Sequence, residues 1–310
     1  MHIPVLLKKS IQSLKIIKNG IYIDATFGSG GHSRAILNQL NSNGKLYAID
    51  KDPKSINIAH KIQDHRFTFI PDSFSNIQKY CKKYNIIKKI NGILLDLGIS
   101  SKQLDDSSRG FSFKKDGPLD MRINTKKGLS AAQWLMRSKQ KKIQEVLKKY
   151  GEERYAKKIA YNICKQNNIK PILRTSELYN VILKSTPYQK KNPARRSFQA
   201  IRIYLNNELK ELKKILSCIT KILSIGGILS VISFHSLEDK IIKNFMFRYS
   251  RKTPNIPKNI PLTYKELKYI NKNQYKFKIF KKIFPTKKEI LKNSRCRSAI
   301  LRSAQLIHDD

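Results

Sequence analysis

Short apolar runs alternate with amphipathic segments along the first hundred residues. Each run has the length of a buried strand, and each segment between them has helical periodicity. This rhythm indicates βαβ units, whose strands form a parallel sheet. The expected strands are 21–25, 45–49, 67–70 and 90–95, and the expected helices are 32–40, 53–62 and 75–84.

The rhythm stops near residue 100 and resumes more than one hundred residues later. Gly, Ser and Asp are frequent in 101–124, which predicts a long loop of the kind that often carries function. Helical periodicity then extends over 130–184, beginning with a capping box at Ser130 and Gln133. The last expected elements are a long helix over 198–223, a buried strand over 228–234 and an edge strand over 298–303.

The simplest architecture is a doubly wound α/β domain that contains an inserted all-helical domain. The expected limits are 1–104 and 196–310 for the two parts of the α/β domain, and 105–195 for the insert. Residues 251–282 are rich in Lys, Asn and Tyr and contain prolines, which predicts a loop or arm outside both cores.

Basic residues outnumber acidic residues, 63 against 22, and give a formal net charge of +41. This balance favours a polyanionic partner, nucleic acid above all. The four cysteines are widely spaced and form no C-x-x-C pair, so a zinc site or a disulfide framework is not expected. The longest apolar run is about half of what a bilayer requires. We therefore expect a cytoplasmic protein that has no membrane partner and no metal.

Four features follow the expected strands in chain order, where ligands of open parallel sheets bind. The turn around Gly30 and Gly31 lets the backbone approach a ligand closely. Asp50 lies about 20 residues after Gly30, where a carboxylate can accept ribose hydroxyls. Phe74 can stack on an adenine, and Asp96 ends the fourth strand beside the expected reacting centre.

The turn itself argues against a dinucleotide. Counted from Gly28, the third glycine of G-x-G-x-x-G is replaced by Ser33, and the turn contains no basic residue for a pyrophosphate. A small carboxylate suits it better, and the methionine end of S-adenosylmethionine supplies one. S-adenosyl-L-methionine is therefore the expected cofactor.

Several long strings of the sequence carry a resemblance to a known family. DATFGSGGHS, ILLDLGISSKQLD, RGFSF and ISFHSLED resemble the MraW/RsmH family, and the likeness extends over residues 2–302. These bacterial enzymes methylate N4 of a decoding-site cytidine, cytosine 1402, in 16S rRNA of the small ribosomal subunit. The resemblance implies a class I, Rossmann-like methyltransferase domain with an inserted all-helical domain. It implies cofactor binding by Gly30, Gly31, His32, Asp50, Phe74, Asp96 and Gln103, of which Gln103 rests on the resemblance alone.

The positions of the cysteines limit which atom of a base could accept the methyl group. Methylation of cytosine C5 requires a cysteine nucleophile, and no cysteine ends an expected strand on the cofactor side. An exocyclic nitrogen or an oxygen remains, although the S-P-P-Y or D-P-P-Y motif of many DNA amino methyltransferases is absent after Asp96. Assignment to N4 therefore rests on the resemblance. The candidate catalytic residues are Asp96, Ser100 and His235, although Ser100 could instead form a turn and His235 could instead orient its own turn.

Other interpretations stay open at this point. The loop Arg109–Phe113 is either a clamp for an unstacked base or a seal between the insert and the main domain. Trp134 lies on an apolar helix face and is expected in the core. The substrate could instead be DNA or protein, or the chain could be an inactive RNA-binding assembly factor; the intact Gly30, Asp50 and Asp96 argue against inactivity. The sequence leaves the oligomeric state open, a homodimer included.

Overall fold

The computed structural model describes residues 4–187, 192–250, 263 and 276–308. The chain forms two compact units, one made of 1–98 with 210–310 and the other of 99–209. We expected 105–195 for the insert. The second unit is longer because the helices before and after that range pack with its own helices.

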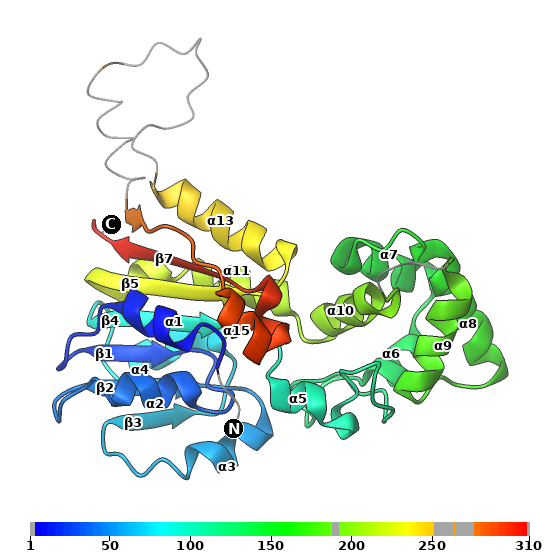
Figure 1. Cartoon of the computed structure of the whole chain (residues 1–310), viewed down its shortest axis with the longest axis horizontal. Coiled ribbons are helices and arrows are strands. Elements are labelled where there is room, and N and C mark those ends of the chain that lie inside the picture. The colour runs from blue at the N-terminus through cyan, green and yellow to red at the C-terminus, as the bar shows by residue number, and fades with distance from the viewer. Residues whose placement is uncertain (1–3, 188–191, 251–262, 264–275, 309–310) are drawn as a thin grey trace. The chain divides into compact units, whose positions relative to one another are not determined.

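The first unit contains a seven-stranded sheet with the order β3-β2-β1-β4-β5-β7-β6 (Figure 1). The first five strands are parallel, and β7 runs antiparallel to both of its neighbours. The expected α/β fold is therefore confirmed, but the expectation of an edge strand near 300 is wrong, since β7 lies between β5 and β6. The strands are β1 (Ile21–Asp24), β2 (Lys45–Ile49), β3 (Phe67–Ile70), β4 (Ile90–Asp96), β5 (Leu223–Ser233), β6 (Phe277–Ile279) and β7 (Ile300–Leu306).

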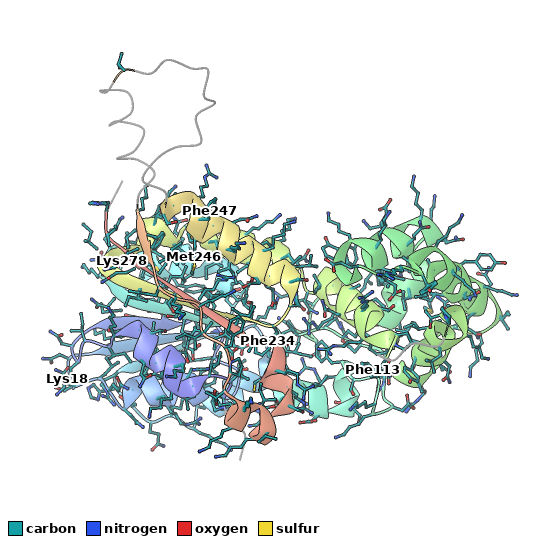
Figure 2. The ribbon with its side chains drawn as sticks, turned by 45° about the horizontal axis from the view of Figure 1, so that its top comes forward. Lys18, Phe113, Phe234, Met246, Phe247 and Lys278 are labelled. Atoms are coloured by element: carbon teal, nitrogen blue, oxygen red, sulfur yellow. The ribbon has the colours of Figure 1, made fainter. Side chains whose placement is uncertain are left out.

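Helices cover both faces of this sheet, as alternation along β4 requires. Leu94 packs with the helices of one face, and its neighbours Ile93 and Leu95 pack with those of the other. On α13, Met246 is buried while the adjacent Phe247 is exposed (Figure 2). One face carries α1 (Leu7–Leu14), α2 (Gly31–Leu37) and α3 (Pro53–Ala59). The other face carries α4 (Ile77–Lys83), α11 (Glu208–Leu216), α12 (Ile219–Ile222) and α13 (Ser236–Ser250). The helix α15 (Lys287–Lys292) precedes β7 in the chain.

The second unit is helical and has its own core. Trp134 is buried there, as expected, and the capping box of Ser130 and Gln133 is present. Two short helical segments lie where the long loop was expected. The elements are α5 (Ser101–Asp105), the 3₁₀ turn η2 (Ser107–Arg109), α6 (Ala131–Arg137), α7 (Gln140–Gly151), α8 (Ala156–Ile169), α9 (Thr175–Ser185) and α10 (Ala194–Leu205).

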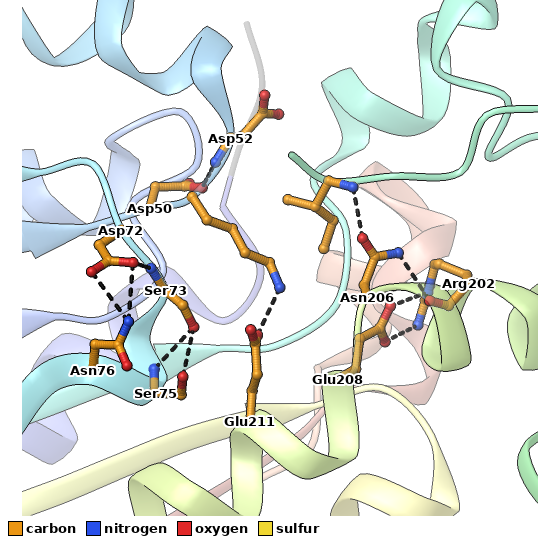
Figure 3. A network of polar contacts seen from close by, with 12 residues as sticks. Asp50, Asp52, Asp72, Ser73, Ser75, Asn76, Arg202, Asn206, Glu208 and Glu211 are labelled. Carbon is orange, nitrogen blue, oxygen red and sulfur yellow. Dashed lines mark hydrogen bonds and ion pairs between the residues drawn. The ribbon is translucent and has the colours of Figure 1, made fainter. Parts of the chain in front are cut away.

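The single long helix expected over 198–223 is wrong, because the chain divides it into α10, α11 and α12. The first break comes at Asn207, whose φ of 53° is left-handed. Its neighbour Asn206 turns its side chain inward, where Oδ1 accepts the N–H of Ile123 at 2.7 Å and Nδ2 donates to the carbonyl of Arg202 at 2.9 Å (Figure 3). Nδ2 also donates to the carbonyl of Met121 at 2.8 Å. An asparagine pair at this point therefore ends the helix by supplying the buried backbone groups with partners.

Most of the lysine-rich arm expected over 251–282 lies outside the described residues. Its described end contains β6, a strand that the pattern did not predict. Within the described part of the chain, no helix is both long enough and apolar enough to cross a membrane.

Candidate active site

The strand order reverses direction between β1 and β4, since β2 and β3 lie on one side of this pair and β5 lies on the other. Ligands of open parallel sheets bind beyond the carboxyl ends of the strands at such a reversal. The structure places Asp24 at the end of β1, Asp96 at the end of β4, and Asp50 directly after β2. Asp50 and Asp96, which the sequence predicted, and Asp24, which it did not, therefore lie along one edge of the sheet.

The turn after β1 requires glycine at two positions. Gly28 and Gly30 have φ values of 53° and 73°, a region that side chains other than glycine rarely adopt. A Cβ atom on Gly30 would also lie 2.8 Å from the ring of Phe27. At Gly31 a Cβ would overlap Cγ of Pro4, so Pro4, in the segment that leads into α1, packs directly on the start of α2. The turn is therefore fixed by packing from both sides.

Asp50 is held by backbone donors on both carboxylate oxygens. Oδ2 accepts the N–H of Gly28 at 2.7 Å. Oδ1 accepts the N–H of Asp52 at 2.8 Å (Figure 3). Burial raises the pKa of Asp50, and these hydrogen bonds act in the opposite direction. The side chain of Ser55 is a third hydrogen-bond partner of this carboxylate. A carboxylate has about four lone-pair sites, so the oriented side chain can still accept a ligand hydroxyl.

Phe74 stands on a rigid turn after β3. Asp72 shapes this turn by accepting hydrogen bonds from the backbone of Ser73 at 2.7 Å and from Nδ2 of Asn76 at 3.1 and 3.2 Å (Figure 3). It also accepts the hydroxyl of Tyr80 at 2.7 Å. The half-buried ring of Phe74 packs against the core of the first unit. Its position is therefore fixed before any ligand binds.

His32 lies in the first turn of α2 and is only 5% exposed. Its Nε2 lies 3.5 Å from Oδ2 of Asp96, and its Nδ1 lies 3.3 Å from Oγ of Ser10 on α1. Burial lowers the pKa of this imidazole, but contact with Asp96 and the nearby charge of Asp24 outweigh burial, so that the net shift is upward. The sequence did not reveal the role of Ser10.

The two acids on either side of this histidine differ in their partners. Asp24 is fully buried, and it accepts hydrogen bonds from Oγ of Ser33 at 2.7 Å and the N–H of Thr26 at 3.2 Å. Burial raises the pKa of Asp24. Oδ1 of Asp96 is also buried, yet it has no hydrogen-bond partner among the described residues. Buried polar atoms are rarely left without a partner, so this oxygen marks a place for a ligand donor.

His235 follows β5, the neighbour of β4, and comes just before α13. Its Nε2 lies 3.1 Å from Oε1 of the buried Glu238, and Oε2 of Glu238 accepts the N–H of Phe234 at 3.0 Å. These contacts fit the interpretation in which His235 orients its own turn. A catalytic role for His235 stays a prediction.

Ser100 and Gln103 belong to the second unit, where they form the capping box of α5. Oγ of Ser100 accepts the N–H of Gln103 at 3.2 Å, and the side chain of Gln103 accepts the N–H of Ser100 at 2.8 Å. The turn interpretation of Ser100 is therefore the one its contacts support. Binding of the cofactor by Gln103 and catalysis by Ser100 stay predictions.

The base-clamp interpretation of the loop 109–113 does not fit the second unit. Phe111 is 5% exposed in its core, and the guanidinium of Arg109 donates to the carbonyls of Arg122 at 3.0 Å and Ile123 at 2.7 Å. Phe113 stacks on Tyr179 with an interplanar angle of 5°. These side chains build the interior of the second unit, so Phe111 cannot stack on an RNA base without leaving that core.

Comparison of the whole sequence with known proteins identifies the family. Residues 1–307 match the MraW methylase family. The chain belongs to this family. Its members are S-adenosylmethionine-dependent methyltransferases. Two relatives are named Ribosomal RNA small subunit methyltransferase H: one from Wigglesworthia glossinidia brevipalpis is 55% identical over 312 residues, covering 100% of both chains, and one from Buchnera aphidicola subsp. Schizaphis graminum is 54% identical over 307 residues, covering 98% of this chain and 97% of the relative.

Solved structures add little to this family assignment. A putative rRNA-methylase from Clostridium thermocellum is 13% identical, covers 100% of both chains and has a TM-score of 0.45. A putative methyltransferase from Streptococcus mutans, in complex with SAH, is 14% identical, covers 99% of this chain and 100% of the other, and has a TM-score of 0.40. At such scores we draw no argument from the likeness.

Proposed function

We propose that this methylase transfers the methyl group of S-adenosylmethionine to the N4 amine of a cytidine, cytosine 1402, in 16S rRNA of the small ribosomal subunit. One observation carries the enzymatic part of the proposal. Asp24, Asp50 and Asp96 converge at the reversal point of the sheet, and Oδ1 of Asp96 is buried there without a partner. The names of the relatives support rRNA of the small subunit as the substrate.

The residues at this edge fit the cofactor. The oriented carboxylate of Asp50 would accept the ribose hydroxyls, and the ring of Phe74 would lie against the adenine. The turn of Gly30, Gly31 and His32 would hold the methionine end, because its glycines let the backbone come close to a ligand. When bound, the cofactor supplies an electrophilic methyl group attached to a cationic sulfur. An edge with three acids suits that positive charge.

The cysteines support nitrogen rather than cytosine C5 as the acceptor. Burial raises the pKa of Cys81 to about 12 and that of Cys218 to about 11, and Cys296 is buried as well. A cysteine must be a thiolate to attack C6, so none of these three is prepared for that step. Methyl transfer to an amine needs only an in-line approach and an acceptor for its hydrogen.

Asp96 is the acceptor that we favour for the amine hydrogen. Its backbone N–H donates to Oγ1 of Thr26 at 2.6 Å, which fixes the end of β4 relative to the turn after β1. His32 lies beside Oδ2, and Oδ1 is left for a donor. A hydrogen bond from the amine to Oδ1 would return electron density to nitrogen, whose lone pair is otherwise delocalised into the ring. Ser100 and His235 are the other two candidates.

The experiment that tests the proposal uses small ribosomal subunits purified without this methylation. They are incubated with the protein and S-adenosylmethionine labelled in the methyl group, and the rRNA is digested to nucleosides. We expect the label on the N4 amine of cytidine and a large loss of rate in the Asp96→Ala variant. Bare rRNA and DNA are run in parallel. Label on another atom, or preferred labelling of DNA or protein, would disprove the assignment.

A further inference from the structure

Ser10 is a fully buried polar residue in α1 that the proposed reaction does not yet use. Its hydroxyl lies 2.9 Å from the carbonyl oxygen of Leu6 and 3.0 Å from that of Leu7, and it donates to the helix at these distances. The same oxygen lies 3.3 Å from Nδ1 of His32. A hydroxyl has one hydrogen and two lone pairs. Because the helix carbonyls take the hydrogen, Oγ meets Nδ1 as an acceptor, and Nδ1 must carry a hydrogen.

The other ring nitrogen of His32 faces an acid. Nε2 lies 3.5 Å from Oδ2 of Asp96, so a bare Nε2 would direct its lone pair at a carboxylate. A neutral imidazole has only one N–H, whereas the imidazolium donates from both nitrogens. Asp96 comes from β4 and Asp24 from β1, and both stabilise a positive charge on His32, while α1 contributes only the neutral hydroxyl of Ser10. The surroundings therefore favour the charged ring.

We propose that Ser10 is a positioning residue of the methyl-transfer site. By accepting Nδ1–H it keeps His32 a cation, which directs Nε2–H at Oδ2 of Asp96 and leaves Oδ1 to the substrate. This inference rests on the proposed function, since the orientation of Asp96 matters to catalysis only if this edge performs methyl transfer. We call Ser10, His32 and Asp96 the relay.

The relay has two effects on the reaction. The imidazolium places a positive charge 3.5 Å from Oδ2 of Asp96, which attracts the carboxylate and holds its orientation. It also lies next to Oδ2, at 3.5 Å from Nε2 and without a hydrogen bond among the described residues, so Oδ1 is the oxygen open to the amine of an incoming base. Neither effect requires His32 to touch the base. Ser10 and His32 act on catalysis by orienting Asp96. Replacing Ser10 should therefore lower the rate of methyl transfer more than it weakens binding of rRNA.

The first test measures the charge of His32 without any substrate. The protein is labelled with ¹⁵N-histidine, and NMR shows which ring nitrogens carry hydrogen; a His32→Gln variant identifies the signals of His32. In the wild type at neutral pH we expect both nitrogens to be protonated. A bare Nδ1 would mean that Ser10 donates instead, and it would overturn the relay.

The second test compares two serines of α1. Ser10→Ala removes the acceptor of Nδ1–H, so His32 should lose its charge at lower pH than in the wild type. Ser13→Ala is the matched control, because Oγ of Ser13 contacts Oγ of Ser230 and the backbone carbonyl of Ser10, both at 2.7 Å, and not the ring of His32. It should titrate like the wild type. Equal titration of His32 in Ser10→Ala and wild type would refute the relay, and cooperative thermal unfolding confirms that each variant is folded.

The activity of the same variants separates the two proposals. For Ser10→Ala we expect kcat to fall about tenfold with little change in KM for the small subunit, as loss of transition-state positioning predicts. An unchanged kcat would remove Ser10 from the reaction. If the wild type carries the charged His32 but labels no cytidine, the proposed function fails while the charge network stands. If the wild type labels cytidine N4 and His32 is neutral, only the relay fails.

Discussion

Gly28 donates its backbone N–H to Oδ2 of Asp50 at 2.7 Å, and this bond joins the turn after β1 to the end of β2. The acid expected to bind ribose therefore also holds the glycine turn expected to bind the methionine end. A second backbone donor, from Asp52, fixes the remaining carboxylate oxygen. Two parts of the cofactor site are thus coupled through one side chain before any ligand binds.

Exchange of Asp50 for Asn tests this coupling. An amide replaces one acceptor by a donor, which would face the N–H of Gly28 or of Asp52. Loss of a charge-assisted hydrogen bond to a ribose hydroxyl costs about 1.5–3 kcal/mol, so we expect affinity for S-adenosylmethionine to fall at least tenfold in calorimetry. Asp64→Asn is the control of equal charge, since Asp64 lies before β3 and pairs with Arg66. Equal affinity of the Asp50→Asn variant and the wild type would exclude the ribose role.

Alanine at Gly30 tests whether the turn is limited by conformation or by space. Gly226 has a similar φ, 84° against 73°, but nothing lies within 4 Å of its Cβ position. Gly226→Ala should therefore show the backbone strain alone, about 1–2 kcal/mol. Gly30→Ala adds the collision with the Phe27 ring, which should cost about 1–3 kcal/mol more in denaturant unfolding. Equal losses in the two variants would mean that the Phe27 ring moves aside freely.

The raised pKa of His32 predicts a stability that falls as pH rises. The folded protein holds this proton more tightly than the unfolded chain does, because Asp96 and Asp24 outweigh the effect of burial. The contribution is complete below the unfolded pKa of about 6.5 and is lost as pH rises through the folded pKa. The difference in unfolding free energy between wild type and His32→Gln should therefore shrink with rising pH. A difference that grows with pH would contradict a charged His32.

Asp239 predicts the opposite dependence. Arg302 on β7 donates to both of its oxygens, at 2.7 and 2.9 Å, and thereby lowers the pKa of Asp239. This stabilisation is present above the unfolded pKa of about 3.9 and is lost as pH falls through the folded pKa. Asp239→Asn should lose about 1–3 kcal/mol at neutral pH, and the loss should fade in acid. Lys170→Ala serves as the comparison: its pair with Glu177 involves a lysine side chain that is 72% exposed, and it should cost less.

The sequence predicted the four strands of the first hundred residues almost to the residue. β1, β2 and β4 are short runs that are largely buried on both faces, and β3, the edge strand, is partly buried. All four are flanked by polar segments, so their apolar pattern does not depend on distant contacts. The acids at the strand ends followed from the same pattern, because parallel strands place their carboxyl ends at one edge. Asp50 and Asp96 could therefore be located from the chain alone.

Other features depend on contacts that the sequence does not display. The helix α1 has left-handed residues at both ends, Leu6 and Lys15, and no side-chain cap at its start, so it carries none of the usual boundary signals. Because nothing in the sequence marks this helix, nothing marks Ser10 within it as a site residue. From the sequence, the aromatic residues of the loop 109–113 fit either a clamp for an unstacked base or a seal between the insert and the main domain. In the structure Phe111 is buried in the core of the second unit.

The discontinuous first unit also constrains how the protein is made. Strand β4 pairs with β1 on one side and with β5 on the other, and β5 follows the whole of the second unit along the chain. During synthesis one edge of β4 is therefore without its neighbour until the second unit has been translated. The helices of that unit make local contacts and can fold meanwhile. An open strand edge in a nascent chain invites pairing with other chains, so slow translation of 99–209 would favour aggregation.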